Sequence, residues 1–523
     1  MNGGGRLRPE VRAIAAVVIV GAIMSILDTT IINVGLDALS RELHAPLSTI
    51  QWVATGYLLA LATVIPLTGW ASERLGARRV WMLVVAGFVV TSGLCGLAWS
   101  AESLIAFRVL QGLAGGMVMP VGMIALAQAA GPRNMGRVMS IVGVPMLLAP
   151  VFGPVIGGLI VEHLDWRWMF FVNIPIGAVG LVMASRLLPR GTARGAAGDS
   201  GRLDARGLLL LSPGIALVVY GLSEVAATGD ALAPGALAPA LGGLILVALF
   251  ALHARRVEFP IVDVRLLGAG GFSAAALTIV LAGAALFGGM LLLPLYYQMA
   301  RGLTALDAGL LLAPQGIGAA IAMHWSGRLT DRIGGGPVVT AGLLVLCLGT
   351  LPFTQVTGST PYWLLVAGLV VRGVGLGFTM MPAMASAFAL LETDQVPRAT
   401  PMLNVLQRVG GAVGTAVLAV VLQRAIDSQV SRAATQLGGG AASSMSADPE
   451  SAVQALPPAA REHLADPIAA AFAHAYWWSL ALVALAIVPA LAMWRQQRRC
   501  AAERQELGPA LPESAEMPRG ATA

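Results

Sequence analysis

The sequence contains no lysine, and only 11% of its 523 residues are charged. Without lysine there is no phosphate-binding loop of the GK[ST] type and no Schiff base, which excludes an ATP-driven pump built on that motif. Four of the histidines, His163, His253, His324 and His474, are scattered without the spacing of metal ligands. We therefore predict that the chain is not an enzyme and that it needs neither a metal nor a cofactor.

Cysteine is also scarce. Cys95 and Cys347 lie within apolar runs and Cys500 lies near the C-terminal end, so no disulfide is predicted. The net charge of +6 needs no nucleic-acid partner, since basic loops beside anionic lipid account for it.

Hydrophobic residues are abundant: they make up 57% of the chain. They gather in runs of about 20 residues, the length with which a helix crosses a bilayer core of roughly 30 Å. The sequence therefore predicts an all-α integral membrane protein with 14 transmembrane helices. The predicted spans are 11–34, 49–69, 80–99, 103–124, 138–160, 169–188, 207–225, 237–252, 272–293, 308–323, 338–351, 362–384, 400–422 and 470–494.

The even number of spans places both termini on one side. Of the 33 arginines, 24 fall on that side when Arg12 and Arg186 at the span ends are included, 6 fall on the opposite side and 3 lie deep within spans. The positive-inside rule then predicts cytoplasmic termini in a cell (plasma or inner) membrane. A cleaved signal peptide is the rival interpretation of the first run, but Asp28 within it and the missing cleavage site disfavour that interpretation.

Two parts of the sequence are repeated. "GWASERLGARR" (69–79) and "GRLTDRIGGG" (327–336) share glycine, an acid at +4, arginine at +5 and glycine at +7. "FRVLQGLAGGMVMP" (107–120) has a fainter counterpart in "VRGVGLGFTMMP" (371–382), which makes Arg372 a candidate relic of Arg108. We predict two pseudo-repeated six-helix bundles, a design that is typical of secondary transporters.

The predicted domains follow from this duplication. They are an N-terminal six-helix bundle (1–190), a cytoplasmic connector with two extra transmembrane helices (191–270), a C-terminal six-helix bundle (271–494) with a long external loop (426–469), and a disordered cytoplasmic tail (495–523).

With these motifs in hand, the chain resembles the major facilitator superfamily, and within it the fourteen-helix drug:proton antiporters that export multiple drugs and quaternary ammonium compounds. The resemblance rests on "LDTTIINV", "GWASERLGARR", "RVLQGLAGG", "GVPMLLAPVFGPVIGG" (143–158) and "LPLYYQMARGLTALDAGLLLAP". The resemblance implies alternating access and proton-coupled export.

Asp28 and Arg108 are the two costly charges, since an ion at the bilayer centre costs about 2.5 to 3.5 kcal/mol. In the resembling family an acid in "LDTT" contributes to proton coupling, and the arginine of "RVLQG" biases the proton on it. We expect Asp28 and Arg108 to form the proton-coupling site. A structural role, with Asp28 satisfied by neighbouring Thr and Asn side chains, is the alternative.

A second group of residues is expected to control conformational change. The repeated loop and the glycine-rich fifth span supply it, and the resemblance assigns to that span the sealing of the outward half. A solvated loop and a generic tight helix crossing are the alternatives. The group contains Gly69, Glu73, Arg74, Gly76, Arg78, Arg79, Gln111, Gly112, Gly143, Gly153, Pro154, Gly157, Gly158, Asp331 and Arg332. We further expect Glu73 to dock at the start of the thirteenth span, with Thr400 as its N-cap.

Substrate-binding candidates come from the spans that line the cavity in the resembling family. Methionine and aromatic side chains suit varied apolar or cationic ligands, although each one is also explained by ordinary packing or lipid contact. The candidates are Trp52, Tyr57, Met146, Phe152, Tyr296, Tyr297, Gln298, Met381, Asn404 and Gln407.

The predicted function is therefore proton-driven antiport that exports hydrophobic or cationic drugs from the cytoplasm. A proton-coupled transporter of a single metabolite is the alternative, because a shared fold fixes cargo poorly. A membrane receptor or scaffold is a distant third. The expected partners are the drug, protons and the lipid bilayer.

Overall fold

The computed structural model describes residues 7–131, 134–189, 203–268, 270–391, 395–437 and 458–506, and all the regular elements within them are helical. The prediction of an all-helical fold is thus confirmed for this part of the chain. The first half contains α1 (Pro9–Glu42), α2 (Leu47–Val64), α3 (Leu67–Leu75), α4 (Ala77–Gly96), α5 (Ala101–Ala130), α6 (Met135–His163), α7 (Trp168–Phe171) and α8 (Asn173–Leu187). The remainder contains α9 (Ala205–Thr228), α10 (Pro234–Ala254), α11 (Gly270–Leu295), α12 (Ala305–Ile333), α13 (Gly335–Thr350), α14 (Tyr362–Ala389), α15 (Val396–Leu437), α17 (Pro458–Glu506) and the short turns η3 (Val264–Gly268), η4 (Tyr296–Ala300) and η5 (Leu351–Gln355).

The number of membrane spans is confirmed only in part. In the described residues eleven helices are long and apolar enough to cross a membrane, and a twelfth is gained if α2 and α3, bent by 56°, count as one span. The helices α6 and α12 are not among these, although each is 29 residues long. Every predicted apolar run does overlap a helix. The count of fourteen spans stays a prediction.

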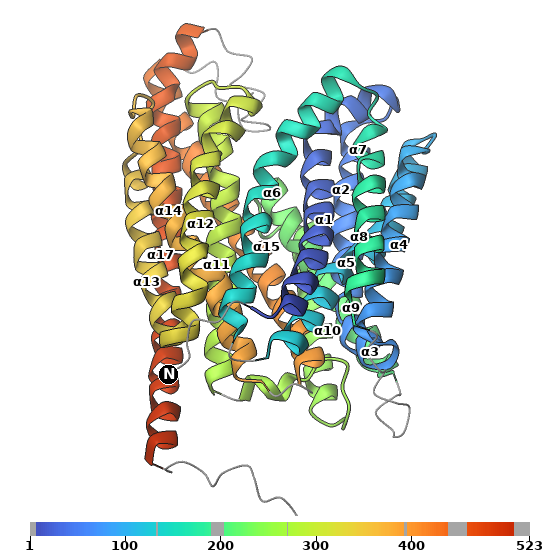
Figure 1. Cartoon of the computed structure of the whole chain (residues 1–523). Coiled ribbons are helices and arrows are strands. Elements are labelled where there is room, and N and C mark those ends of the chain that lie inside the picture. Colours follow the sequence, from blue (N-terminus) through green and yellow to red (C-terminus); the bar gives the residue numbers. More distant parts are fainter. Residues whose placement is uncertain are drawn as a thin grey trace, which may run out of the picture.

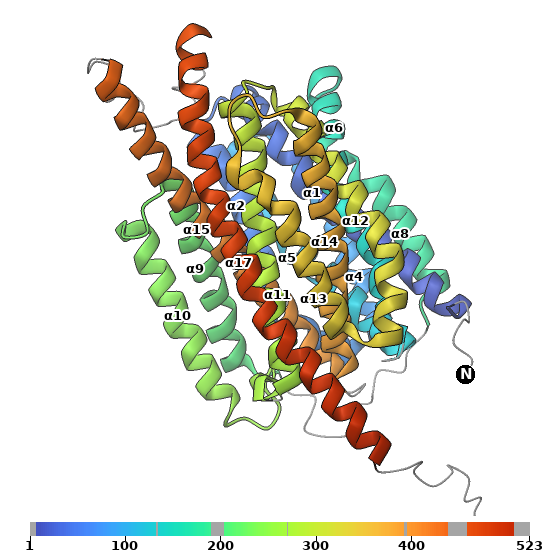
Figure 2. The ribbon, with the colours of Figure 1, turned by 90° about the vertical axis from the view of Figure 1, so that its left-hand side faces the viewer.

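The helices form two bundles with a pair of helices at their flank. One bundle contains α1, α2, α4, α5, α6 and α8, and the other contains α11 to α15 and α17 (Figure 1). The extra helices α9 and α10 pack on each other at one side, where α9 also contacts α2 and α15 (Figure 2). The start of α1 and the end of α17 lie toward the same lower side in both views.

The hydrophobic core is continuous at one end of the molecule and divided at the other. One cluster joins residues of both bundles, from Val11 and Val138 to Phe272 and Met493, in the lower half. Toward the upper end, each bundle has a cluster of its own. The ribbons accordingly approach each other below and diverge above (Figure 1). The two bundles are therefore packed together mainly at the end where α1 begins.

The repeated loops adopt the same backbone conformation in both halves. Gly76 follows α3 with φ 83° and Gly334 follows α12 with φ 86°. Each amide donates to a carbonyl four residues earlier, that of Ser72 or Thr330, and each glycine precedes the next helix. A positive φ is open to glycine at little cost and is strained for residues with a side chain. The shared glycine at +7 is therefore a backbone requirement of this turn.

Replacing Gly334 with alanine is expected to destabilise the protein, because a side chain at its φ of 86° and ψ of 161° costs about 1 to 3 kcal/mol. Gly242 in α10 is the matched control, since its φ is not positive and an added Cβ meets no atom within 4 Å. The measurement is the midpoint of thermal unfolding of the purified protein in detergent. Equal midpoints for Gly334→Ala and Gly242→Ala would contradict the assignment.

Candidate functional site

Asp28 lies at the centre of a buried polar network in the first bundle. Its side chain in α1 is 0% exposed, and Oδ2 accepts a hydrogen bond from Arg108 Nη1 at 2.7 Å. Oδ1 accepts from Gln111 Nε2 at 3.0 Å and from Asn173 Nδ2 at 2.8 Å. Three donors from two other helices, α5 and α8, thus hold one carboxylate.

Arg108 is 1% exposed and is held equally firmly. Its Nε donates to the carbonyl of Val53 at 3.1 Å, and Nη1 also donates to Gln111 Oε1 at 2.8 Å. The ring of Tyr57 lies under the guanidinium, 4.1 Å from its centroid. A buried ion pair is tolerated when its remaining polar atoms are bonded in this way. Tyr57, predicted to bind substrate, therefore covers the ion pair.

The sequence predicted the two charges and Gln111 but not their whole surroundings. Asn173 was missed, although an amide within the apolar run 169–188 was a visible signal. It also donates to Ser92 Oγ at 3.1 Å. The alternative that neighbouring Thr and Asn side chains satisfy Asp28 is met in part. Asn173 donates to its carboxylate, whereas Thr29 and Thr30 donate to carbonyls of their own helix, one turn back.

This arrangement links the Asp28 carboxylate to the position of α5. Movement of α5 relative to α1 would withdraw the cation and one amide at once, because Arg108 and Gln111 lie on the same helix.

A first contact between the bundles joins Asp331 to the start of α6. Asp331 Oδ1 accepts from the backbone amide of Gly136 at 2.9 Å, Oδ2 accepts from that of Arg137 at 3.3 Å, and Arg137 Nε lies 3.4 Å away. Burial raises the pKa of the Asp331 carboxyl, and these donors lower it in part. An added Cβ at Gly136 would meet the carbonyl of Gly327, so both glycines permit the close approach.

A second contact is its counterpart in the other half. Glu73 at the end of α3 accepts a hydrogen bond from Arg398 Nε, in the first turn of α15, at 3.2 Å. A Cβ at Gly69 would meet the carbonyl of Pro397. The acid of each repeated loop therefore reaches the first turn of the fifth helix of the opposite bundle.

Glu73 contacts the start of α15 as predicted, but the predicted N-cap and the predicted bonding partner are wrong. The helix α15 begins at Val396, so Thr400 lies inside it and donates to the carbonyl of Val396 at 2.8 Å instead of capping it. Glu73 bonds the Arg398 side chain. The backbone docking expected of Glu73 is made by Asp331. The sequence favoured Thr400 because Pro401 suits a first turn, but α15 accommodates this proline in its interior.

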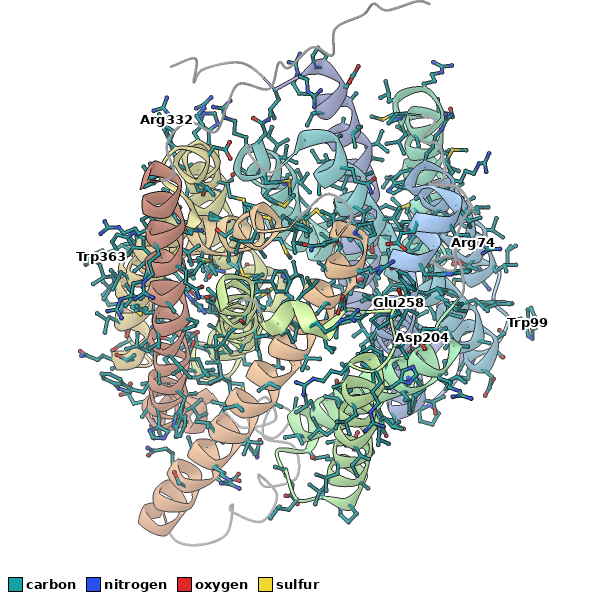
Figure 3. The ribbon with its side chains drawn as sticks, turned by 90° about the horizontal axis from the view of Figure 1, so that it is seen from below. Arg74, Trp99, Asp204, Glu258, Arg332 and Trp363 are labelled. Carbon is teal, nitrogen blue, oxygen red and sulfur yellow. The ribbon has the colours of Figure 1, made fainter. Side chains whose placement is uncertain are left out.

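The segment between α10 and α11 lies against the second contact. The ring of Phe259 is 5.2 Å from the Arg398 guanidinium. Asp204 caps α9 through Gly207 N at 2.8 Å, bonds His253 Nε2 at 2.8 Å and accepts from the amide of Ile261 at 3.4 Å. Figure 3 shows Arg74, Glu258 and Asp204 grouped on this side, with Arg332 at the other bundle. The extra helices are thus connected to the contact between the bundles.

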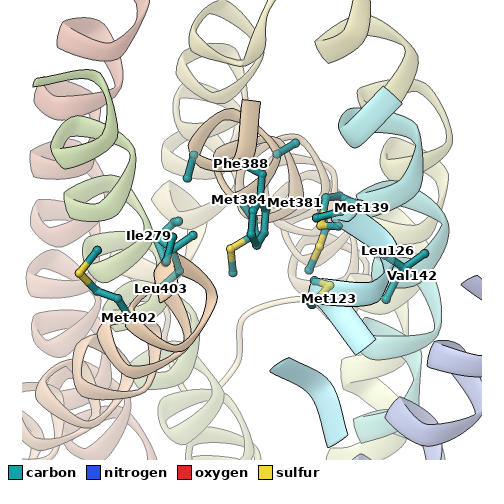
Figure 4. Close-up of a cluster of buried hydrophobic side chains, with 14 of the residues drawn as sticks. Met123, Leu126, Met139, Val142, Ile279, Met381, Met384, Phe388, Met402 and Leu403 are labelled. Carbon is teal, nitrogen blue, oxygen red and sulfur yellow. The ribbon is translucent and has the colours of Figure 1, made fainter. Parts of the chain in front are cut away.

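Several methionines belong to the buried cluster that joins the two bundles, and Figure 4 shows Met123, Met139, Met381, Met384 and Met402 among them. We call this group the methionine seal: Met123, Met139, Met323, Met381, Met384 and Met402, all buried. A Cβ at Gly143 would lie 2.5 Å from Met381 Cγ and 2.6 Å from Met323 Cε. Methionine repacks easily because it is unbranched and polarizable. Met381, and the half-buried Met146 packed beside the cluster, were predicted as substrate contacts; here they lie in or beside this seal.

The other predicted gating residues are dispersed. Gly112 packs on the Tyr57 carbonyl of α2, and Gly153 and Gly157 in α6 pack on Thr30 and Ile31 of α1. An added Cβ at Gly158 would meet nothing within 4 Å, and Pro154 lies within α6.

The arginines of the two repeated loops differ in their surroundings. Arg74 lies over Trp70 at 5.8 Å, and Arg78 donates to the carbonyl of Ser185 at 2.6 Å. Arg79 and Arg332 are exposed.

The remaining substrate candidates do not converge on one place. Trp52 stacks on Tyr220 of α9 at 5.9 Å, at the flank, and Phe152 is exposed on α6. Tyr296 and Tyr297 are buried in the upper cluster of the second bundle.

Three polar candidates bond or pack within the second bundle. Gln298 donates to the carbonyl of Pro294, and Asn404 donates to that of Thr400. The backbone of Gln407 packs on Gly283.

Two helical bundles of repeated design, joined at one end and built around a buried intramembrane ion pair, define a membrane transporter. The match of the Major Facilitator Superfamily model to residues 18–415 shows that the chain belongs to this family. A "Multidrug resistance protein B homolog" of Mycobacterium tuberculosis is 37% identical over 491 residues, covering 92% of this chain and 90% of that protein. The "Methylenomycin A resistance protein" of Streptomyces coelicolor is 32% identical, covering 81% of this chain and 88% of that protein.

The fold is also found among solved structures. That of the human organic anion transporter MFSD10 (TETRAN) matches with a TM-score of 0.60 at 17% identity, covering 91% of this chain and 100% of that one. At this identity the likeness shows the fold alone.

Asp331→Asn is expected to loosen the first contact, because a hydrogen bond to a charged group contributes about 1.5 to 3 kcal/mol. The measurement is the alkylation rate of a cysteine at buried position 326, where Ser326 lies 3.4 Å from Ser140 across the bundles. We expect the alkylation rate to rise roughly tenfold or more, which is the factor that corresponds to the lower end of this free-energy range. The experiment uses a background without the native cysteines. Asp263→Asn is the control, since Asp263 pairs with Arg265 in its own loop; equal rates in both variants would contradict the role.

Proposed function

We propose that the protein is a proton-driven antiporter that exports hydrophobic or cationic drugs from the cytoplasm by alternating access. In this proposal it crosses the cell membrane fourteen times with both termini cytoplasmic. The observation that carries it is the buried Asp28 carboxylate, bonded by Arg108 and Gln111 from another helix. The names of the multidrug and antibiotic resistance relatives support drugs as the cargo.

The conformation supports alternating access. Both acid contacts, the methionine seal and the continuous core lie at the end where α1 begins. With that end cytoplasmic, the protein is closed inward and faces outward. In this outward-facing state Asp28 is paired with Arg108, so the carboxylate holds no added proton and is ready to accept one from outside.

Protonation of Asp28 then favours the return to the inward-facing state. A proton on Asp28 cancels its attraction to Arg108 and weakens the link between α1 and α5. Reopening inward requires the Asp331 and Glu73 contacts to break and the methionines to part. Release of the proton to the cytoplasm restores the pair, and the drug moves outward in exchange.

A transporter of a single metabolite is the second candidate. It is favoured by the dispersal of the predicted substrate contacts, and by Arg408, a half-buried arginine in α15 that the sequence analysis did not single out. A fixed cation within a span suits a cargo of defined charge better than a range of cations.

Asp28→Asn is expected to abolish drug-triggered proton release from inside-out vesicles that hold a preformed pH gradient, because an amide cannot take up the proton. A pH-sensitive dye reports the release, with a panel of cationic and neutral drugs. Asp230→Asn, at an exposed acid in the turn after α9, is the matched control and should respond like the unmodified protein. A response intact in Asp28→Asn would give Asp28 a structural role, and no response of the unmodified protein to any drug would favour the single-metabolite transporter.

Arg108→Ala is expected to uncouple transport, because Asp28 then loses its cation and remains protonated through the cycle. Arg108→Lys should restore part of the coupling, since it keeps the charge but not the planar set of donors to Val53, Gln111 and Asp28. The same vesicle assay measures both. Full proton-coupled transport by Arg108→Ala would refute the coupling role.

A further inference from the structure

The second bundle contains a buried arginine with no countercharge. Arg372 in α14 is 2% exposed, and its Nε and Nη1 have no hydrogen-bond partner among the described residues. The same part of the chain contains no acid within ion-pair distance of Arg372. Burying an unpaired cation costs more free energy than burying an unpaired neutral polar group.

The surroundings of Arg372 contain further unsatisfied polar groups. Tyr476 of α17 interacts with it electrostatically, and the hydroxyl of Tyr476 also has no partner in the described residues. Elsewhere in the same bundle, the hydroxyl of Tyr297 and the Oγ of Ser479 are also buried without a described partner. Native proteins satisfy nearly all buried polar atoms. A cation and nearby hydroxyl donors together are a donor set for an anion.

The packing of glycines shows which residue of the first bundle corresponds to Arg372. In the first bundle Gly112 packs on the Tyr57 carbonyl of α2, and in the second bundle Gly373 packs on the Gln315 carbonyl of α12. Gly116 and Gly377 repeat the relation one turn later, on the carbonyls of Leu61 and Ala319.

Gly373 therefore corresponds to Gly112. Arg372 corresponds to Gln111, and the expectation that it is a relic of Arg108 is wrong. Gln111 donates to Asp28 of α1, whereas the Arg372 guanidinium lies against Gly289 of α11, where an added Cβ would meet it.

We propose that Arg372 is the fixed cation of an anion-binding site inside the second bundle, completed by one monovalent anionic group of the size of chloride or formate. The anion pairs with Arg372 as the Asp28 carboxylate pairs with Arg108 in the first bundle. Arg372 supplies the charge, and the hydroxyl of Tyr476 supplies a further donor. The anionic group is either a dissolved ion or a carboxylate carried by the cargo. The site is independent of the proton pathway through Asp28.

The test is the thermal unfolding midpoint of the purified full chain at constant ionic strength, with chloride or formate replacing the bulky anion gluconate. We expect a saturable rise of the midpoint for the unmodified protein. The rise should be lost in Arg372→Gln, which has no cation, and in Gly289→Asp, which supplies the carboxylate from the chain. Arg265→Gln, at an exposed arginine of the η3 turn, should keep the full rise.

A second arm separates the sources of the anion. A fluorescent dye with one carboxylate is compared with its methyl ester in an equilibrium binding assay, each in gluconate and in chloride. If the acid binds more tightly than its ester, and both chloride and Gly289→Asp remove the difference, the cargo is a source of the anion. If acid and ester bind equally, the anion is the dissolved ion. Equal midpoints in chloride, formate and gluconate, with equal dye binding, would overturn the proposal, as would a rise that persists in both Arg372→Gln and Gly289→Asp. Because Asp28 is unchanged in these variants, failure here leaves the vesicle test of antiport unaffected.

Discussion

The cost of burying the charge of Asp28 governs the construction of the first bundle. An ion in the apolar interior needs a countercharge and bonded lone pairs. The chain meets this need with Arg108 and Gln111 from α5 and with Asn173 from α8. Three helices are therefore positioned around one carboxylate. In the antiport mechanism proposed above, the contacts that stabilise the bundle are also the ones that a proton on Asp28 would weaken.

The contacts between the bundles follow from the duplication of the chain. In each half the repeated loop ends a helix with a glycine at positive φ and directs an acid toward the opposite bundle. Asp331 uses two backbone amides at the start of α6, where a helix favours negative charge. Glu73 uses the side chain of Arg398, which Phe259 also covers. The duplicated motif thus gives two contacts of related geometry and different chemistry, one of which the extra helices can influence.

Much of the fold was predictable because membrane helices are specified by composition. Apolar runs of about 20 residues and a repeat with fixed glycine and acid spacing are local signals. Asp28, Arg108 and Gln111 were predictable because charge inside a span is rare. The start of α15 and the partner of Glu73 were not, since the position of Arg398 depends on contacts between distant segments. The dispersal of Trp52, Phe152 and Tyr296 has the same cause: candidates were chosen by residue type, and tertiary packing decides where each type faces.

The two bundles share one design but differ in the charged groups that they bury. The first holds Asp28 against Arg108 as a buried ion pair. The second holds Arg372 against Gly289, a buried positive charge with no countercharge among the described residues. In a rocking transporter the state that is populated depends on differential interactions in the two conformations. If both proposals hold, the cycle has two separate inputs: a proton acting through α1 and α5, and an anionic group acting through α11 and α14.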